Sequence, residues 1–325
     1  MGIMSELLVF KPYLMYILAL LLNQESKFKQ HSISNLFQKS TKSIRAFLNN
    51  IVDFDKLFLT IIRIFNIDLS QGYFSIDDTA YSKPYSNKLK HLSTLFDHAS
   101  KGYTKGLVVV FICWSNGKIT LPISFKIWHK NLGKTRIDLA LELILHARKI
   151  SKDKHIGFKF DSFYTAKKLL GYLQKNHIFF ACRLAKSRNV LLEDKLTKLK
   201  SIPFGKRCLN VWLPGVGKVW ITKYDGKFYC SNCPPDYQKQ LYEWYAQRWC
   251  IEMVFRFCKS ELKMQDCQGF SYEQHYNHIG FCFLTYGLLQ AVFPHLNVYK
   301  AKNLVQSKLV VKTVTLKPQA FLLCA

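Results

Sequence analysis

Residues 72–184 alternate between short β-rich apolar runs and segments with helical periodicity, and this alternation constrains the fold most strongly. Gly106 to Trp114 and Ile119 to Trp128 are apolar runs joined by Asn116-Gly117, a typical hairpin turn. Thr135 to Ile150 then repeats its apolar residues with the period of an α-helix. Strands that alternate with helices favour an α/β sheet. We therefore predict an α/β fold for this part of the chain.

The segments on either side divide the chain into four expected parts. Residues 1–68 are predicted to be helical, and they resemble either a DNA-binding helix-turn-helix in outline or a plain helical cap. Residues 69–186 hold the first part of the α/β core, and residues 187–235 read as an insertion rich in short strands. Residues 236–325 hold the second part of the core and a basic C-terminal tail.

Positive charge is in large excess, which indicates a polyanionic partner. The 325 residues include 47 Lys and Arg against 21 Asp and Glu, a net charge of +26. Nucleic acid is the expected partner, because aromatic residues make up 15% of the chain and bases stack on aromatic rings. An anionic membrane surface is the second candidate. An apolar fraction of 49% excludes a disordered chain.

The N-terminal apolar stretch and the cysteines bear on location. Leu7 to Leu22 is interrupted by Lys11-Pro12, and the uninterrupted part covers about half of a bilayer span. We expect a buried amphipathic helix there and no membrane partner. The ten cysteines are scattered through apolar segments, which is typical of free thiols in a reducing compartment. The expected location is the cytoplasm.

Carboxylates are scarce, so their positions are informative. Asp77 and Asp78 are predicted to end a strand that starts at Tyr73, and Asp161 ends the short strand Ile156 to Phe160. In open α/β sheets, functional groups collect at the carboxyl ends of strands. Two such acids and a third from elsewhere can hold Mg²⁺, which prefers oxygen ligands. The plainer alternative is a strand that ends in turn-forming residues.

One predicted helix, from Asp236 to about Lys263, carries a polar stripe of Tyr245, Arg248, Glu252 and Lys259. At about 100° per residue these side chains fall within about 60° of one another. An arginine can bind a phosphate with two hydrogen bonds, and a lysine can neutralise a second phosphate. The glutamate between them would complete a metal site. The alternative, a solvated helix face, is less consistent with the apolar residues that flank the stripe.

The same four residues carry a family resemblance. Tyr245-x2-Arg248-x3-Glu252-x6-Lys259 matches the YREK signature in every residue and every spacing. With it the chain resembles the DDE transposases of bacterial insertion sequences, in the insertion-sequence-four group.

Two shorter motifs extend the resemblance over about residues 70–290. Asp78-Thr79 is similar to the first Asp motif of the group, and Asp161-Ser162-Phe163-Tyr164 is similar to the second. A β-rich insertion between the second Asp and the Glu is also typical of the group. Trp212 and Trp220 lie in that insertion, where a Trp of such enzymes often stacks on a flipped base; we expect both in the core instead.

The resemblance implies an RNase H-like catalytic core with a D-D-E triad of Asp78, Asp161 and Glu252. These carboxylates would hold two Mg²⁺ or Mn²⁺ ions. Water, and then the freed 3′-hydroxyl, would attack phosphodiesters at the ends of the element in a cut-and-paste reaction, often through a hairpin. Asp77 is the alternative first ligand, and Asp78 is preferred because the family pairs its Asp directly with Thr.

The resemblance also implies the partners. Double-stranded DNA, both at the insertion-sequence ends and at the target, would be bound by Tyr245, Arg248 and Lys259. The protein would act as a homodimer in a synaptic complex. Two alternatives remain open: a catalytically inactive relative that only binds DNA, and a nuclease of the same fold.

Overall fold

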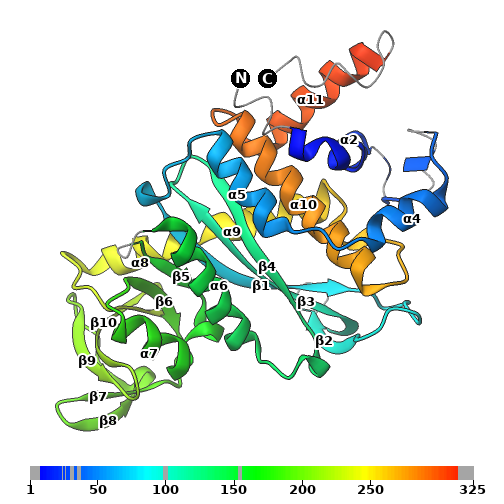
Figure 1. Cartoon of the computed structure of the whole chain (residues 1–325). Coiled ribbons are helices and arrows are strands. Elements are labelled where there is room, and N and C mark those ends of the chain that lie inside the picture. The colour runs from blue at the N-terminus through cyan, green and yellow to red at the C-terminus, as the bar shows by residue number, and fades with distance from the viewer. Residues whose placement is uncertain are drawn as a thin grey trace.

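The computed structural model describes residues 8–23, 25, 27–29, 33–34, 38–97, 102–152 and 156–313. Within them, eleven strands form one mixed sheet (Figure 1). In chain order the strands are β1 (Tyr73–Ser82), β2 (Ser93–Asp97), β3 (Gly102–Ser115), β4 (Thr120–Trp128), β5 (Phe158–Phe160), β6 (Phe180–Leu184), β7 (Asn189–Leu192), β8 (Lys195–Lys198), β9 (Leu209–Leu213), β10 (Gly217–Tyr224) and β11 (Lys227–Ser231). Their order across the sheet is β2-β3-β1-β5-β6-β11-β10-β9-β7-β8, with β4 also paired to β3.

The strands around β1 define the core. β1 is antiparallel to β3 and parallel to β5, and β5 is parallel to β6. β3 and β4 form the predicted hairpin, in which Gly117 has a φ of +85° that favours glycine. Apolar β-branched and aromatic residues bury both faces of β3 from Leu107 to Trp114. The predicted α/β fold is confirmed.

Helices cover both faces of the sheet. The helices that matter below are the 3₁₀ helices η1 (Leu8–Tyr13) and η4 (Ser162–Tyr164), and the α-helices α2 (Leu14–Leu22), α4 (Thr41–Asn49), α5 (Phe54–Ile64), α6 (Arg136–Ser151), α7 (Lys167–Lys175), α8 (Gln238–Ala246), α9 (Trp249–Ser260), α10 (Tyr272–Val292) and α11 (Val298–Thr313). Figure 1 shows α10 and α6 on either side of the central strands, and α8 near β5 and β6.

Alternation along β1 assigns its two aspartates to opposite faces. Asp77 is paired with Phe111 of β3, whose ring stacks on Phe283 of α10, so Asp77 lies on the face that α9 and α10 cover. Asp78 points to the other face, where Arg136 at the start of α6 reaches it.

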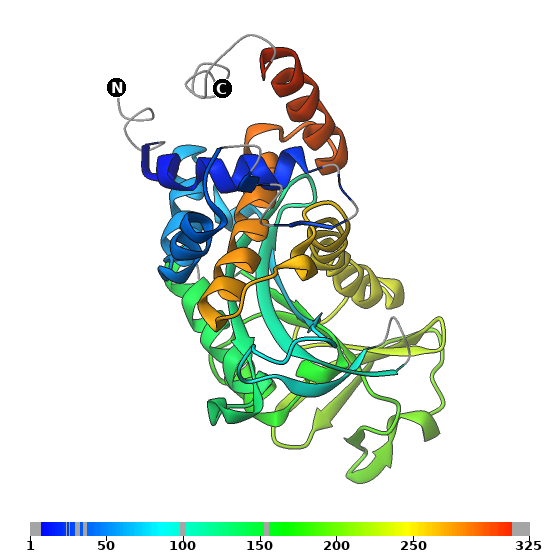
Figure 2. The ribbon, with the colours of Figure 1, turned by 90° about the vertical axis from the view of Figure 1, so that its right-hand side faces the viewer.

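The N-terminal helices pack on α10 at one end of the molecule, opposite the end that holds β7–β10 (Figure 2). The Tyr16 hydroxyl of α2 and Nδ1 of His278 lie 2.7 Å apart; Nε2 of His278 donates to the Lys263 carbonyl, so in the neutral ring Nδ1 accepts from Tyr16. Asn277 of α10 accepts from Val52 and donates to two carbonyls at the end of α4. Ser40 caps α4 by accepting from the Ser43 amide.

The apolar N-terminal stretch forms η1 and α2, and α2 buries Tyr16, Ile17 and Leu20. In the part of the chain that the structure describes, no helix has the length and apolar character needed to cross a bilayer. Parts of the region predicted to be helical, residues 1–7 and 35–37 among them, lie outside the described residues.

The segment from 187 to 235 carries β7–β11. β9, β10 and β11 form an antiparallel meander, and β11 pairs with β6, so these strands continue the central sheet. The core placement expected for Trp212 is wrong, because Val211 and Leu213 point inward on β9 and leave Trp212 54% exposed.

The prediction that a strand ends at the paired acids is wrong. β1 continues to Ser82 because Thr79 and Tyr81 are buried and the ladder with β3 runs on to Gly106. Asp77 and Asp78 therefore lie in the middle of a strand. Asp161 does follow the last residue of β5, as predicted.

The prediction of one long helix after Asp236 is also wrong. The chain forms α8 and α9, separated by Gln247 and Arg248. At this junction Arg248 donates to the Tyr245 carbonyl and Ile251 donates to the Arg248 carbonyl, both across three residues. This is the tighter 3₁₀ pattern, which changes the direction of the side chains relative to a straight α-helix. The polar stripe is thus shared between two helices.

Candidate active site

Three polar side chains line up across the sheet, one from the middle of β1, one directly after β5 and one near the end of β6. The positions two residues earlier on these strands are in register with one another, and side chains two apart share a face. Asp77, Asp161 and Arg183 therefore point to the face of the sheet that α8 and α9 cover. Asp161 has an extended backbone and accepts from the Phe163 amide at 2.9 Å, which orients its carboxylate.

The junction between α8 and α9 places Arg248 over this row. Its Nη1 donates to Asp77 at 2.5 Å, and its Nη2 donates to Glu252, one turn along α9. The Arg248 side chain is only 10% exposed. The guanidinium thus joins the carboxylate from β1 to the carboxylate from α9.

Burial makes the charged carboxylates costly. It raises the pKa of Asp77 to about 7, against the lowering effect of Arg248 and with a further rise from the charge of Asp161. Burial also raises the pKa of Asp161, and the Phe163 amide and Arg248 oppose that rise. Buried anions of this kind gain from a bound cation.

Asp78 belongs to a separate group on the other face of the sheet. It accepts from Nη1 of Arg136 at 2.8 Å and from the hydroxyl of Tyr164 at 2.7 Å. Burial raises the pKa of Tyr164, and the charge of Asp78 adds to this, so the phenol stays a hydrogen-bond donor. Asp78 thereby connects α6 to the turn that carries Asp161.

The expected DNA-contact residues lie around Arg248. The Tyr245 ring is 5.5 Å from the Arg248 guanidinium and 5.1 Å from the Tyr229 ring. Lys259 lies in the last turn of α9, two turns beyond Glu252. Of the six predicted site residues, the structure brings Tyr245, Arg248 and Glu252 directly together.

Arg183 is a site residue that the sequence reasoning missed. It is half-buried on β6, and its charge lowers the pKa of Asp161 after the larger effects of burial, the Phe163 amide, Arg248 and Asp78. Burial raises the pKa of Tyr229 and Tyr245, and the charge of Arg183 opposes that rise in the same minor way. A signal was present, because Arg183 follows the apolar run from Ile178 to Cys182 just as Asp161 follows the run from Ile156 to Phe160.

The lysines that follow Asp77 and Asp78 differ in how accessible they are to DNA. Lys83 is not available to DNA, because its ammonium donates to the carbonyls of Gln265 and Cys267 at 2.5 and 2.7 Å. Lys88 is exposed and lies 4.7 Å from the Phe270 ring.

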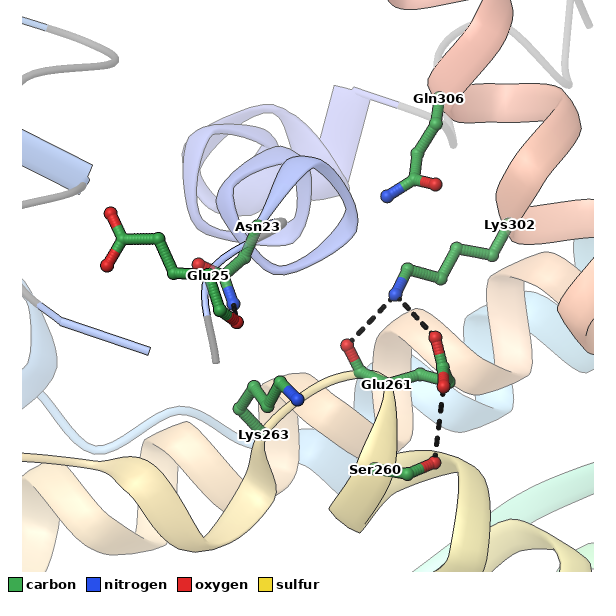
Figure 3. A pocket seen from close by; sticks show the side chains of 7 residues that line it. All are labelled: Asn23, Glu25, Ser260, Glu261, Lys263, Lys302 and Gln306. Atoms are coloured by element: carbon green, nitrogen blue, oxygen red, sulfur yellow. Dashed lines mark hydrogen bonds and ion pairs between the residues drawn. The ribbon is translucent and has the colours of Figure 1, made fainter. Parts of the chain in front are cut away.

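A polar pocket lies at the other end of α9 (Figure 3). Its volume is about 280 Å³, and it is lined by Asn23, Glu25, Ser260, Glu261, Lys263, Lys302 and Gln306. Lys302 donates to the Glu261 carboxylate at 2.8 Å and to its carbonyl at 3.1 Å, so these two charges satisfy each other. The carboxylates of the candidate site are not part of its lining.

No cluster of three His, Cys, Asp or Glu residues in the described ranges is arranged to hold a metal ion. Arg248 links Asp77 and Glu252, so their oxygens are directed at a guanidinium. The site nevertheless concentrates carboxylate oxygens, the ligand type that Mg²⁺ and Mn²⁺ prefer.

Comparison with known proteins agrees with this chemistry. The family model for the transposase DDE domain matches residues 120–288, which include Asp161 and Glu252 and begin after β1. The chain is also similar to the solved cryo-EM structure of a piggyBac transposase synaptic complex with hairpin DNA, with a TM-score of 0.54 and 11% identity over 96% of this chain and 73% of that chain. At this identity the likeness is one of fold. No curated protein matches the chain. Because the family model spans more than half of the sequence, the chain belongs to the transposase DDE domain family and is a DNA transposase.

Proposed function

We propose that Asp77, Asp161 and Glu252 are the catalytic carboxylates of this transposase, in an RNase H-like core. The observation that carries the proposal is the shared guanidinium, because Arg248 joins Glu252 to Asp77. Asp78, preferred on sequence alone, is bound instead to Arg136 and Tyr164 on the other face.

The donor set fits divalent metal ions. Asp77 and Asp161 are half-buried, burial raises the pKa of both, and the charge of Asp161 raises that of Asp77 further, so a cation bound between them would relieve an existing cost. Two Mg²⁺ or Mn²⁺ ions held by the three carboxylates would activate the attacking oxygen and stabilise the leaving oxygen. Arg248 has to leave at least part of this carboxylate contact for the ions to bind.

The chain's own residues would hold the DNA. Arg248 binds the carboxylates directly and Arg183 lies on the same face of the sheet, and each can bind a phosphate with two N–H groups. The Tyr245 ring lies 5.5 Å from the Arg248 guanidinium and offers stacking or a hydroxyl contact, and Lys259 adds a charge further along α9. Trp212, exposed on β9, is available to stack on a base.

The proposed reaction follows the insertion-sequence-four group with the YREK signature. Water attacks a phosphodiester at the element end, the bond to the 3′-oxygen breaks, and a 3′-hydroxyl is freed. That hydroxyl then attacks a second phosphodiester, either in the target or in the opposite strand to form a hairpin. We propose that a homodimer in a synaptic complex carries out these steps, in the cytoplasm on nucleoid DNA.

A cleavage and strand-transfer assay tests the proposal. The substrate is DNA with the ends of the element that encodes the chain, in Mg²⁺ or Mn²⁺, with Asp161→Ala and Glu252→Gln in parallel. We expect metal-dependent cutting at the ends by the wild type, and neither cutting nor transfer by the variants, which still bind. Binding without cutting by all three proteins would instead support the inactive relative. Cutting without strand transfer would support the nuclease.

A further inference from the structure

A stacked pair of side chains, Arg136 and Phe163, lies beside the carboxylates on the α6 side of the sheet. The Arg136 guanidinium carbon is 3.9 Å from the centre of the Phe163 ring. This distance is typical of face-to-face contact between a guanidinium and an aromatic ring. The Trp128 ring lies on the same guanidinium at 5.9 Å.

Several hydrogen bonds hold this pair in place. Nη1 of Arg136 donates to Asp78, and the hydroxyl of Tyr164 donates to the other oxygen of the same carboxylate. The Phe163 amide donates to Asp161. Arg136 is thus hydrogen-bonded to Asp78, and Phe163 to Asp161. These bonds set the geometry of the pair before any ligand binds.

The pair is nevertheless accessible. Phe163 is 44% exposed and the Arg136 side chain is 31% exposed. The ion pair with Asp78 uses Nη1, and a guanidinium has five N–H donors in all. The Phe163 ring therefore lies two residues along the chain from Asp161, which is proposed to act at the cut, and the partly exposed Arg136 guanidinium stacks on that ring.

We propose that Arg136 and Phe163 bind the nucleotide next to the phosphodiester that is cut, with its base stacked on the Phe163 ring and its phosphate on the Arg136 guanidinium. This inference rests on the proposed function, because Asp161 marks the place of the cut. A DNA strand that crosses the sheet at the carboxyl end of β5, beside Asp77 and Asp78 of β1, passes from the Arg248 side to the Arg136 side. The nucleotide that follows the reacting phosphate then reaches Phe163.

This assignment also gives Asp78 a task that is distinct from metal binding. By accepting from Arg136 and Tyr164, Asp78 acts as a positioning residue for the nucleotide site and for the turn that holds Asp161. The adjacent aspartates of β1 thus act on opposite faces of the sheet.

A fluorescence titration tests the pair with the full-length protein. The probe is a DNA duplex with one unpaired terminal 2-aminopurine, whose fluorescence falls when the base stacks; the end sequence need not be known, because stacking is tolerant of sequence. Ca²⁺ replaces Mg²⁺ so that the probe stays uncut. We expect quenching with the wild type, and quenching retained by Phe163→Trp.

Phe163→Ala should abolish the quenching and weaken binding by about 5-fold to about 150-fold, the range for loss of one base–aromatic stack. Phe270→Ala is the matched control, because Phe270 is 49% exposed and also lies under cations, Arg45 and Lys88, but far along the chain from the acids. The control should quench and bind like the wild type.

Salt dependence separates a phosphate contact from a structural role. Arg136→Gln should reduce the slope of log affinity against log salt by about one, whereas Arg136→Lys should keep the slope and lose part of the quenching. Thermal unfolding of each variant identifies a folding defect.

The inference is overturned if the folded Phe163→Ala variant quenches the probe like the wild type. It is also overturned if Phe270→Ala loses as much quenching and affinity as Phe163→Ala. These results leave the proposed function untouched when the wild type still cuts element ends. Conversely, a wild type that quenches but never cuts would refute the proposed function and retain the nucleotide site.

Discussion

Neutralising Asp77 should stabilise the metal-free protein at neutral and alkaline pH. Its pKa is raised from the ordinary 3.8 to about 7 because the side chain is buried. The folded protein therefore binds a proton at Asp77 more tightly than the unfolded chain does, and stability falls as the pH rises from about 4 to about 7. At about 1.4 kcal/mol per pKa unit, the charged Asp77 costs the folded state about 4 kcal/mol above pH 7.

Asp77→Asn removes this cost. After relaxation of Arg248 we expect the free energy of unfolding to rise by about 2–4 kcal/mol at pH 8. Urea unfolding in EDTA at pH 4, 6 and 8 measures it, and the gain should vanish towards pH 4. Asp78→Asn is the matched control: an amide cannot accept from both Arg136 and Tyr164 as the carboxylate does, so this variant should lose about 1–3 kcal/mol. A destabilised Asp77→Asn at pH 8, or a gain independent of pH, would refute the argument.

Three further predictions concern other parts of the molecule. Arg248→Ala should slow cleavage and reduce the salt slope of DNA binding by about one, and an unchanged slope would argue against a phosphate contact. Gly280→Ala should lower the free energy of unfolding by about 1–3 kcal/mol, because a Cβ there lies 2.2 Å from a phenylalanine ring of α5. In Gly205→Ala the added Cβ meets no atom within 4 Å, so this control should unfold like the wild type, and equal losses would contradict the packing argument. Burial lowers the pKa of His275 to about 4 and that of His278 to about 3, so each stays neutral in the fold and stability is lost as the pH falls below about 6.5, by about 1.4 kcal/mol per pH unit per histidine. His278→Gln should reduce that acid sensitivity in urea unfolding relative to the wild type, and an identical pH profile would contradict this.

Local patterns in the sequence predicted the elements but not their final partners. The β3–β4 hairpin, the helix after Thr135 and the short strand before Asp161 follow from turn residues and periodicity, which are local properties. The end of β1 did not follow, because the strand is extended by its ladder with β3, a partner distant in sequence.

The two aspartates of β1 illustrate the same limit at the site. Alternation predicts that Asp77 and Asp78 face opposite ways, but it does not say which face receives α9. That choice depends on packing between α9, α10 and the sheet, which the sequence does not display. The break at Gln247 and Arg248 was equally hidden, since neither residue is a helix breaker.

The spacing of Tyr245, Arg248 and Glu252 correctly predicted that their side chains lie together, but the single helix inferred from it is wrong. Tyr245, Arg248 and Glu252 do meet, although two helices rather than one present them. Arg183 was absent from the prediction because only the parallel pairing of β5 with β6 brings it beside Asp161.

Metal-dependent rescue tests the central claim, that Asp77 rather than Asp78 is a metal ligand, most directly. Cysteine in place of a ligand favours the softer Mn²⁺ over Mg²⁺. End cleavage by Asp77→Cys and Asp78→Cys is therefore measured in both metals. We expect Asp77→Cys to be inactive in Mg²⁺ and restored in Mn²⁺, with an unchanged metal preference for Asp78→Cys. Restoration by Mn²⁺ at Asp78 and not at Asp77 would contradict the account.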